Sequence, residues 1–184
     1  HGFPKEELKR RFAYYGGYCQ LNIDVTPHGY LYAVGRYVGA LYSSELAIVA
    51  PDGVVLANPI DLQCTVFDIA VDSDGLVLAA CKNGPVKKVL RDGSLETRGS
   101  FAPGCSDYFS YSDPTGLTVL EDGSILVADG QCHRLRKILP NNTMAVISGT
   151  GLPGDGGDGE APLSAQLGFV AKKTDRLSFV LIAG

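Results

Sequence analysis

The sequence predicts an all-β fold, and three observations lead to that prediction. The 184 residues include 23 glycines spread along the chain, which indicates many turns and therefore many short strands. Three segments align without gaps and start at residues 23, 69 and 117, which are 46 and 48 residues apart. Each segment contains an apolar run, a polar turn that ends in glycine and a second apolar run. This pattern is typical of a β-hairpin.

A second hairpin follows the first in each segment, so each unit is expected to contain four strands. Glycine suits the turns because they require a positive φ, which is costly for a residue with a Cβ atom. The predicted turns of the first hairpins are at Gly29, Gly75 and Gly123, and those of the second hairpins are at Gly53, Gly93 and the pair Asn141-Asn142.

Four-stranded units that repeat every 40 to 50 residues are typical of the blades of a β-propeller. We therefore expect an incomplete propeller of about three to four antiparallel blades. The expected blades span residues 21–58, 64–100 and 113–150, and a degenerate fourth starts near residue 165. Residues 1–20 are expected to form an N-terminal extension with a short amphipathic helix. Because a blade must bury both faces, further blades or self-association should cover the outer two.

The third unit carries a specific family resemblance. Residues 113–138 and 149–169 strongly resemble an NHL repeat, whose name-giving trio corresponds here to Cys132-His133-Arg134, with a cysteine in place of the usual asparagine. The resemblance is looser over residues 64–100 and only topological over residues 21–58. It implies a propeller, commonly six-bladed, whose relatives mostly recognise proteins, RNA or ligands, while a minority are enzymes.

Charge and hydropathy exclude several classes of function. A net charge of −4 and a pI of about 5.3 argue against a nucleic-acid partner, which would need clustered basic residues. The densest basic cluster, Lys9-Arg10-Arg11, is interpreted as a solvated helix face. No apolar run approaches the length of about 20 residues that a transmembrane helix needs. The sequence does not indicate a cellular compartment.

The five cysteines leave two alternatives open. They form no CxxC pair and are odd in number, so the sequence predicts neither a zinc site nor a complete disulfide framework. They are either buried free thiols or, in a secreted protein, contribute to one or two disulfides. The triplet Asn141-Asn142-Thr143 is a glycosylation sequon, a short motif that also occurs by chance.

Candidate metal ligands occur in two places, and for both we expect a structural role. His133 stands at the family's repeat position, where a histidine recurs without chemistry. Asp155, Asp158 and Glu160 lie in a glycine-rich segment that resembles a calcium loop but lacks the EF-hand spacing, and the family carries such a segment between blades. We therefore predict no catalytic residue and no cofactor, with Ca²⁺ as the alternative. Asp129 is expected to hydrogen-bond a neighbouring turn.

The sequence favours a binding or scaffolding module with a protein or small-ligand partner. Two loops, residues 36–44 and 102–113, are rich in aromatic residues, which are favoured interface anchors on loops. The alternative for these residues is a small satellite core. The predicted partner-binding residues are Tyr37, Tyr42, Tyr108, Phe109 and Tyr111.

Two other functional hypotheses remain. One is a propeller enzyme of the lactonase, esterase or lyase kind, in which a metal ion on the central axis polarises the substrate. The inner strands are mainly aliphatic, and their few polar residues form no obvious cluster. The other is a truncated gene product without independent function, because the chain begins with His1 and stops within an apolar run at Gly184.

Overall fold

The structure, a computed structural model, describes residues 21–26, 28–36, 43–56, 59–82, 84–99, 101 and 114–168. Within these ranges, twelve strands form three four-stranded antiparallel sheets, which confirms the predicted all-β class. The first sheet contains β1 (Leu21–Val25), β2 (Leu31–Arg36), β3 (Ser44–Val49) and β4 (Ile60–Asp61); the second contains β5 (Val66–Val71), β6 (Val77–Cys81), β7 (Val86–Val89) and β8 (Leu95–Arg98); the third contains β9 (Pro114–Val119), β10 (Ile125–Asp129), β11 (Arg134–Ile138) and β12 (Met144–Ser148).

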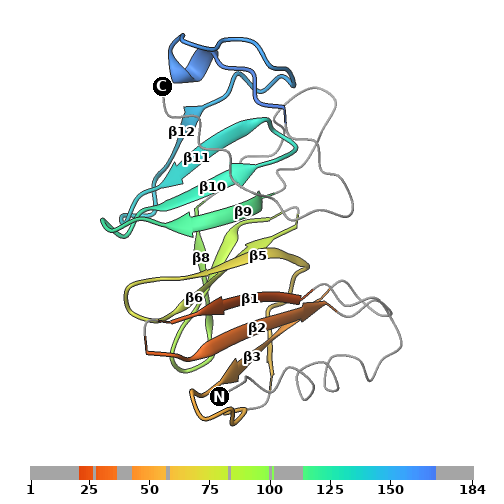
Figure 1. Cartoon of the computed structure of the whole chain (residues 1–184), viewed down its shortest axis with the longest axis vertical. Helices are drawn as coiled ribbons and strands as arrows, with labels where there is room; N and C mark the ends of the chain where they lie inside the picture. The colour runs from red at the N-terminus through yellow and green to blue at the C-terminus, as the bar shows by residue number, and fades with distance from the viewer. Residues whose placement is uncertain are drawn as a thin grey trace.

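The three sheets follow one another along the molecule as successive blades (Figure 1). Within each sheet the strands lie in chain order, joined by antiparallel hairpins. The first strand of each sheet contacts the first strand of the next, so that β1 lies against β5 and β5 against β9. These strands form the inner edges of an arc of three blades, which is the arrangement of a partial propeller.

The described hairpin turns share one geometry, which explains the glycines. In the turn of residues 120–124, the amide of Gly123 donates to the carbonyl of Leu120, and the amide of Leu120 donates to the carbonyl of Ser124. The fourth residue of such a turn lies in the left-handed region of φ, where glycine costs least. The residues with this positive φ include all five predicted glycines and Asn142, namely Gly29, Gly53, Gly75, Gly93, Gly123 and Asn142.

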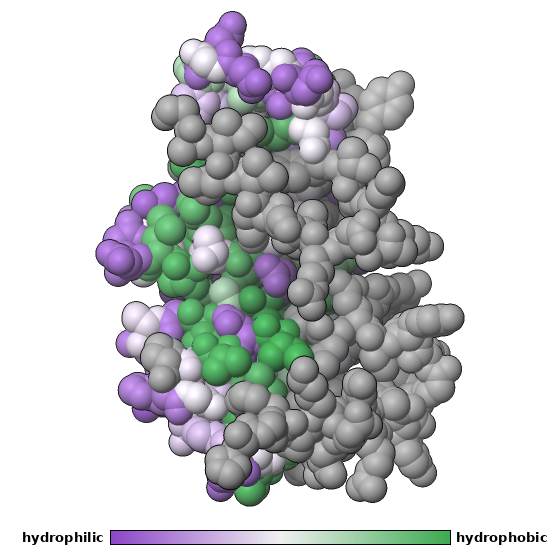
Figure 2. All heavy atoms as spheres, viewed as in Figure 1, coloured by the Kyte–Doolittle hydropathy of each residue, from purple (hydrophilic) through white to green (hydrophobic). Residues whose placement is uncertain are grey.

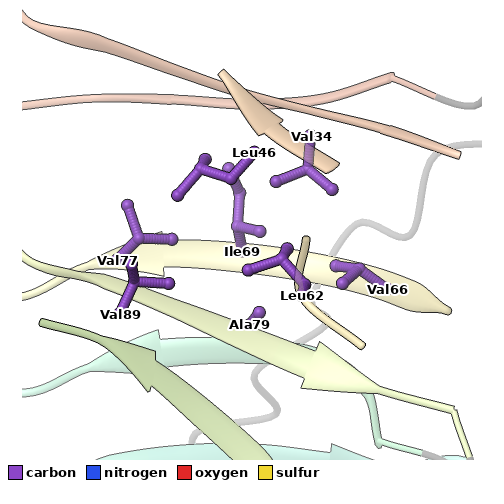
Figure 3. Close-up of a cluster of buried hydrophobic side chains, with 8 residues drawn as sticks. All are labelled: Val34, Leu46, Leu62, Val66, Ile69, Val77, Ala79 and Val89. Carbon is purple, nitrogen blue, oxygen red and sulfur yellow. The ribbon is translucent and has the colours of Figure 1, made fainter. Parts of the chain in front are cut away.

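The first interface, between the first and second sheets, contains aliphatic side chains that point toward one another (Figure 3). Val34 and Leu46 come from β2 and β3, while Ile69 and Val77 come from β5 and β6. Because side chains alternate along a strand, each sheet offers one face to this cluster. The full cluster is Val34, Leu46, Leu62, Val66, Ile69, Val77, Ala79 and Val89.

The second interface, between the second and third sheets, contains a matching cluster. Leu78 and Ala80 point to the opposite face of β6 from Val77 and Ala79 and pack against the third sheet. All five residues of β6 are buried, since the second blade is covered on both faces. The cluster is Ala70, Leu78, Ala80, Val86, Leu117, Ile125, Val127 and Ile138.

Three cysteines in the described part of the chain are disulfide-bonded. Cys64 is bonded to Cys81, which ends β6 and pairs across the ladder with Val66. Cys132 is also disulfide-bonded. For these three residues, the alternative of free thiols is therefore wrong. The other two, Cys19 and Cys105, lie outside the described residues.

Two ends of the predicted blades differ from expectation. The fourth strand of the first sheet, β4, lies at residues 60–61, beyond the expected boundary at 58. The segment before it forms only an isolated bridge between Val49 and Val55, and Pro59 cannot donate to a ladder. Residues 149–168 contain no strand and only one short 3₁₀ helix, η1 (Pro162–Ser164). The N-terminal extension and residues 169–184 lie outside the described part.

Candidate functional site

Two carboxylates lie on the inner edge of the arc, which in a propeller surrounds the central channel. Asp24 lies on β1 between Ile23 and Val25. Those two neighbours are about half exposed, at 49% and 46%, and alternate with Asp24, so they point away from the second sheet. The Asp24 side chain faces β5, where its Oδ2 accepts a hydrogen bond from the Val71 amide at 2.9 Å.

The second carboxylate repeats this contact one blade further along. Asp68 on β5 accepts a hydrogen bond at its Oδ2 from the amide of Leu117 on β9, at 3.0 Å. Both carboxylates thus connect an inner strand to the backbone of the next blade, and neither contact was foreseen from the sequence. An acidic residue within an otherwise apolar inner strand is the signal that could have identified them.

Burial raises the pKa of Asp68 above its ordinary value, because a charged carboxylate is poorly solvated between packed sheets. The negative charge of Asp24 acts in the same direction, while hydrogen bonds from the amides of Leu117 and Ile69 oppose the shift. A carboxylate with a raised pKa can serve as a general acid. Here its hydrogen bond to the next blade also gives it a structural role.

A buried ion pair lies in the third blade, at the end of β10 that is remote from the β9–β10 turn. Asp129, at the end of β10, is fully buried, and its Oδ2 accepts a hydrogen bond from the Arg136 Nε at 2.7 Å. The Arg136 guanidinium lies 5.7 Å from the centre of the Phe101 ring, in a cation–π contact. Asp129 was expected to bond a turn, and its ion pair with the adjacent strand β11 was not predicted.

His133 anchors the connection that follows the third blade. It has a positive φ of 47°, and its Nδ1 donates a hydrogen bond to the Leu167 carbonyl at 2.9 Å. Gly149 lies so close that a Cβ there would overlap the His133 carbonyl oxygen. The histidine therefore holds residues 149–168 against the start of β11.

The glycine-rich segment turns its carboxylates outward. Asp155, Asp158 and Glu160 are all exposed. The segment is closed by its own backbone, with the Thr150 amide donating to the Ala165 carbonyl at 2.9 Å. Across the described residues, no group of three or more His, Cys, Asp or Glu side chains is placed to hold a metal ion. His133 and the three carboxylates are thus not brought together as ligands.

The five predicted partner-binding residues lie outside the part of the chain that the structure describes, namely Tyr37, Tyr42, Tyr108, Phe109 and Tyr111. In the described part, apolar side chains gather over the middle of one face, where the inner strands lie (Figure 2). Where the chain is described, no helix is long and apolar enough to cross a membrane.

Comparisons with known proteins show the fold. No family model matches the chain, and no curated protein sequence matches it significantly. A protein of unknown function from Bacteroides thetaiotaomicron is similar in structure, with a TM-score of 0.60 and 18% identity over 87% of this chain and 42% of that chain. Virginiamycin B lyase from Staphylococcus aureus gives a TM-score of 0.54 and 16% identity over 68% of this chain and 40% of that chain.

A streptogramin B lyase is similar to the same degree, with a TM-score of 0.54 and 14% identity over 70% of this chain and 44% of that chain. The chain therefore spans less than half the length of each of these three structures. At such identities the likeness concerns the fold alone. The fold is that of a β-propeller, of which the described residues form three blades.

Proposed function

We propose that this chain is part of an NHL-type β-propeller that binds a protein or small-ligand partner. The observation that carries the proposal is the role of the inner-strand carboxylates. In a propeller these strands surround the axis, where an enzyme would place its polar groups. Asp24 and Asp68 instead accept hydrogen bonds from backbone amides of the next blade, with nitrogen–oxygen distances of 2.9 and 3.0 Å. The described inner edge is thus built for cohesion between blades.

A cohesive scaffold suits recognition by loops. Binding residues are concentrated on loops that a rigid framework positions, and here the framework has two apolar interfaces and a disulfide within the second blade. Tyr37 and Tyr42 precede β3, while Tyr108, Phe109 and Tyr111 precede β9. We propose these aromatic side chains as the anchors of the partner surface.

A loop variant tests this surface. Partners of the full-length protein would be identified by chemical cross-linking and mass spectrometry, and their affinity then measured with purified components. The double variant Tyr108→Ala/Tyr111→Ala should weaken binding by about tenfold or more, since truncated aromatic anchors typically cost about 2 kcal/mol.

The matched control is Tyr30→Ala, which removes an exposed tyrosine from the inner turn of the first blade. It should leave the affinity unchanged. Equal affinities for the wild type and the Tyr108/Tyr111 variant, with the fold intact, would contradict the proposed surface.

The second candidate is a propeller enzyme of the lactonase, esterase or lyase kind. This candidate is supported by the names of two similar structures, a virginiamycin B lyase and a streptogramin B lyase. Such an enzyme would polarise its substrate with a metal ion on the axis. It would carry one tightly held Ca²⁺ or Zn²⁺ per molecule in the purified full-length protein, whereas the binding module would not require one.

A further inference from the structure

The outer hairpin turn of the third blade contains a glycosylation sequon. Asn141-Asn142-Thr143 is the only Asn-x-Ser/Thr triplet in the 184 residues. It lies between β11 and β12, and all three of its residues are exposed. The acceptor side chain is therefore accessible in the folded blade.

The two residues that define the sequon are hydrogen-bonded to each other. The Thr143 hydroxyl donates to the Asn141 Oδ1 at 2.7 Å, and the Thr143 amide donates to the same oxygen at 3.1 Å. The middle residue points elsewhere, because the Asn142 Oδ1 accepts a hydrogen bond from the Gly99 amide in the second blade at 2.7 Å. This inter-blade bond gives Asn142 a structural role that Asn141 does not share.

The equivalent turn of the second blade shows what is unusual about Asn141. In Asp92-Gly93-Ser94 the carboxylate accepts the same two hydrogen bonds, from the Ser94 amide at 2.9 Å and its hydroxyl at 2.6 Å. Aspartate also stands at this turn position in Asp52, Asp74 and Asp122. At Asp52, Asp92 and Asp122 the carboxylate accepts a hydrogen bond from the amide two residues further on. Aspartate therefore suffices for this turn, whereas glycosylation requires the amide nitrogen of asparagine.

The disulfides supply the second, independent observation. Cys64 and Cys81 are bonded to each other, and Cys132 is disulfide-bonded as well. Disulfides form and persist in oxidising environments such as the lumen of the endoplasmic reticulum and the cell exterior. N-linked glycans are attached in that same lumen, so disulfides are what a chain that meets the glycosyltransferase would carry.

We propose that Asn141 is an N-glycosylation site on the outer edge of the third blade. The donor is an oligosaccharide linked to a lipid diphosphate, brought by the transferase of the secretory pathway. The Asn141 amide nitrogen attacks C1 of the first sugar. The N–C1 bond forms, the bond from C1 to the phosphate oxygen breaks, the nitrogen loses one proton and the lipid diphosphate leaves. No oxidant or reductant is required.

A glycan at this position would also protect the third sheet. β12 is the last strand of its sheet in the described residues, and an exposed edge strand invites pairing with other chains. A bulky, hydrated group at the start of β12 would hinder such pairing. The inner edge, on the opposite side of the sheet, would remain uncovered.

The full chain would be expressed behind a secretory leader in eukaryotic cells, and in parallel translated in the presence of microsomes. We expect a gel-mobility shift that peptide-N-glycosidase removes, leaving aspartate at position 141 in the mass spectrum of the peptide. Asn141→Asp, which reproduces the Asp92 turn, and Thr143→Ala should both abolish the shift. Asn142→Gly, which keeps an Asn-x-Thr triplet and a left-handed turn residue, should retain it.

Translocated, protease-protected chain without a glycan at Asn141 would overturn the proposal. So would a glycan that persists in Asn141→Asp. The microsome assay depends only on translocation, so it remains decisive if a variant is retained in the cell because it folds poorly.

Discussion

The two interfaces between blades have similar aliphatic cores but differ in their polar contacts. The first contains larger side chains, such as Leu46 and Leu62, together with the hydrogen bond from the Tyr32 hydroxyl to the Gly75 carbonyl at 2.7 Å. The second contains more alanine, at Ala70 and Ala80, and is crossed by the hydrogen bond from the Gly99 amide to the Asn142 Oδ1 at 2.7 Å. The buried Asp129–Arg136 ion pair lies within the third blade, where Arg136 contacts Phe101 at the edge of this interface. Stacking of blades therefore depends on apolar faces, while the polar contacts vary.

The inner-edge hydrogen bonds extend this comparison. Among the described residues, an inner-strand carboxylate accepts a hydrogen bond from the next blade at each interface, yet the two carboxylates stand at different repeat positions. Asp24 aligns with Ala70 in the second unit, whereas Asp68 aligns with Asn22 in the first and Gly116 in the third. The contact recurs in space without recurring in the sequence pattern.

The largest expected effect is on the ion pair of the third blade. Arg136→Met removes the cation beside a fully buried carboxylate, and breaking a buried pair in this way costs about 3–5 kcal/mol. The free energy of unfolding would be measured by denaturant titration. Replacing both partners, as in Asp129→Leu/Arg136→Met, should recover most of the loss. A single variant as stable as the wild type would show that the pair contributes little.

The disulfide of the second blade should have the next largest effect. Cys64→Ser/Cys81→Ser opens a link between residues 17 apart in sequence, which should lower the free energy of unfolding by about 2–4 kcal/mol. Thermal unfolding under non-oxidising conditions would measure it. Reductant should lower the stability of the wild type more than that of the variant, and an equal response would contradict a role for this bond.

A smaller effect is expected at Asp68. Asp68→Ala leaves the buried Leu117 amide without its acceptor and should cost about 1–3 kcal/mol. Asp68→Asn keeps an acceptor and removes the charge. Because the folded-state pKa is raised, the stabilising contribution of the protonated acid is present at low pH and is lost as the pH rises through that pKa.

The pH dependence separates these two roles of Asp68. Asp68→Asn should equal or exceed the wild type in stability at neutral pH, and the difference should shrink as the pH falls from the raised folded-state pKa toward the ordinary range of aspartate. Unfolding measured between pH 3 and pH 7 would check this. A variant that is less stable than the wild type at neutral pH and equally stable at low pH would contradict a raised folded-state pKa of Asp68.

The smallest expected effect concerns the first interface. Tyr32→Phe removes only the hydroxyl that donates to the Gly75 carbonyl, so it should destabilise by about 1 kcal/mol. Its effect should add to that of Arg136→Met, since the two sites lie in different interfaces. Strong coupling between them in a double-mutant cycle would show that the two interfaces are not independent.

The repeat made the fold predictable, because apolar alternation and turn glycines are local signals. The positive φ of Gly75 and Gly123 follows from such signals. The contacts of the inner edge were not predictable in this way. Asp24 and Val71 are 47 residues apart, and their meeting depends on how one blade stacks on the next.

The cysteine pairing has a similar explanation. Cys64 and Cys81 meet because the β5–β6 register sets Val66 opposite Cys81. Five cysteines allow many pairings, and composition alone cannot choose among them. Asp129 was identified as a structural residue from its place at the end of a strand, but its partner Arg136 lies two residues beyond its ladder position on β11.

If the inner-strand carboxylates hydrogen-bond the next blade and do not bind a metal ion, removing their charge should leave metal binding unchanged, and a calorimetric titration measures this most directly. Ca²⁺ and Zn²⁺ would each be added to the full-length, metal-free protein and to Asp24→Asn/Asp68→Asn. We expect the same titration curve for both proteins, because neither carboxylate would bind the ion. Saturable binding of one ion per wild-type molecule that disappears in the folded double variant would contradict it and favour the enzyme.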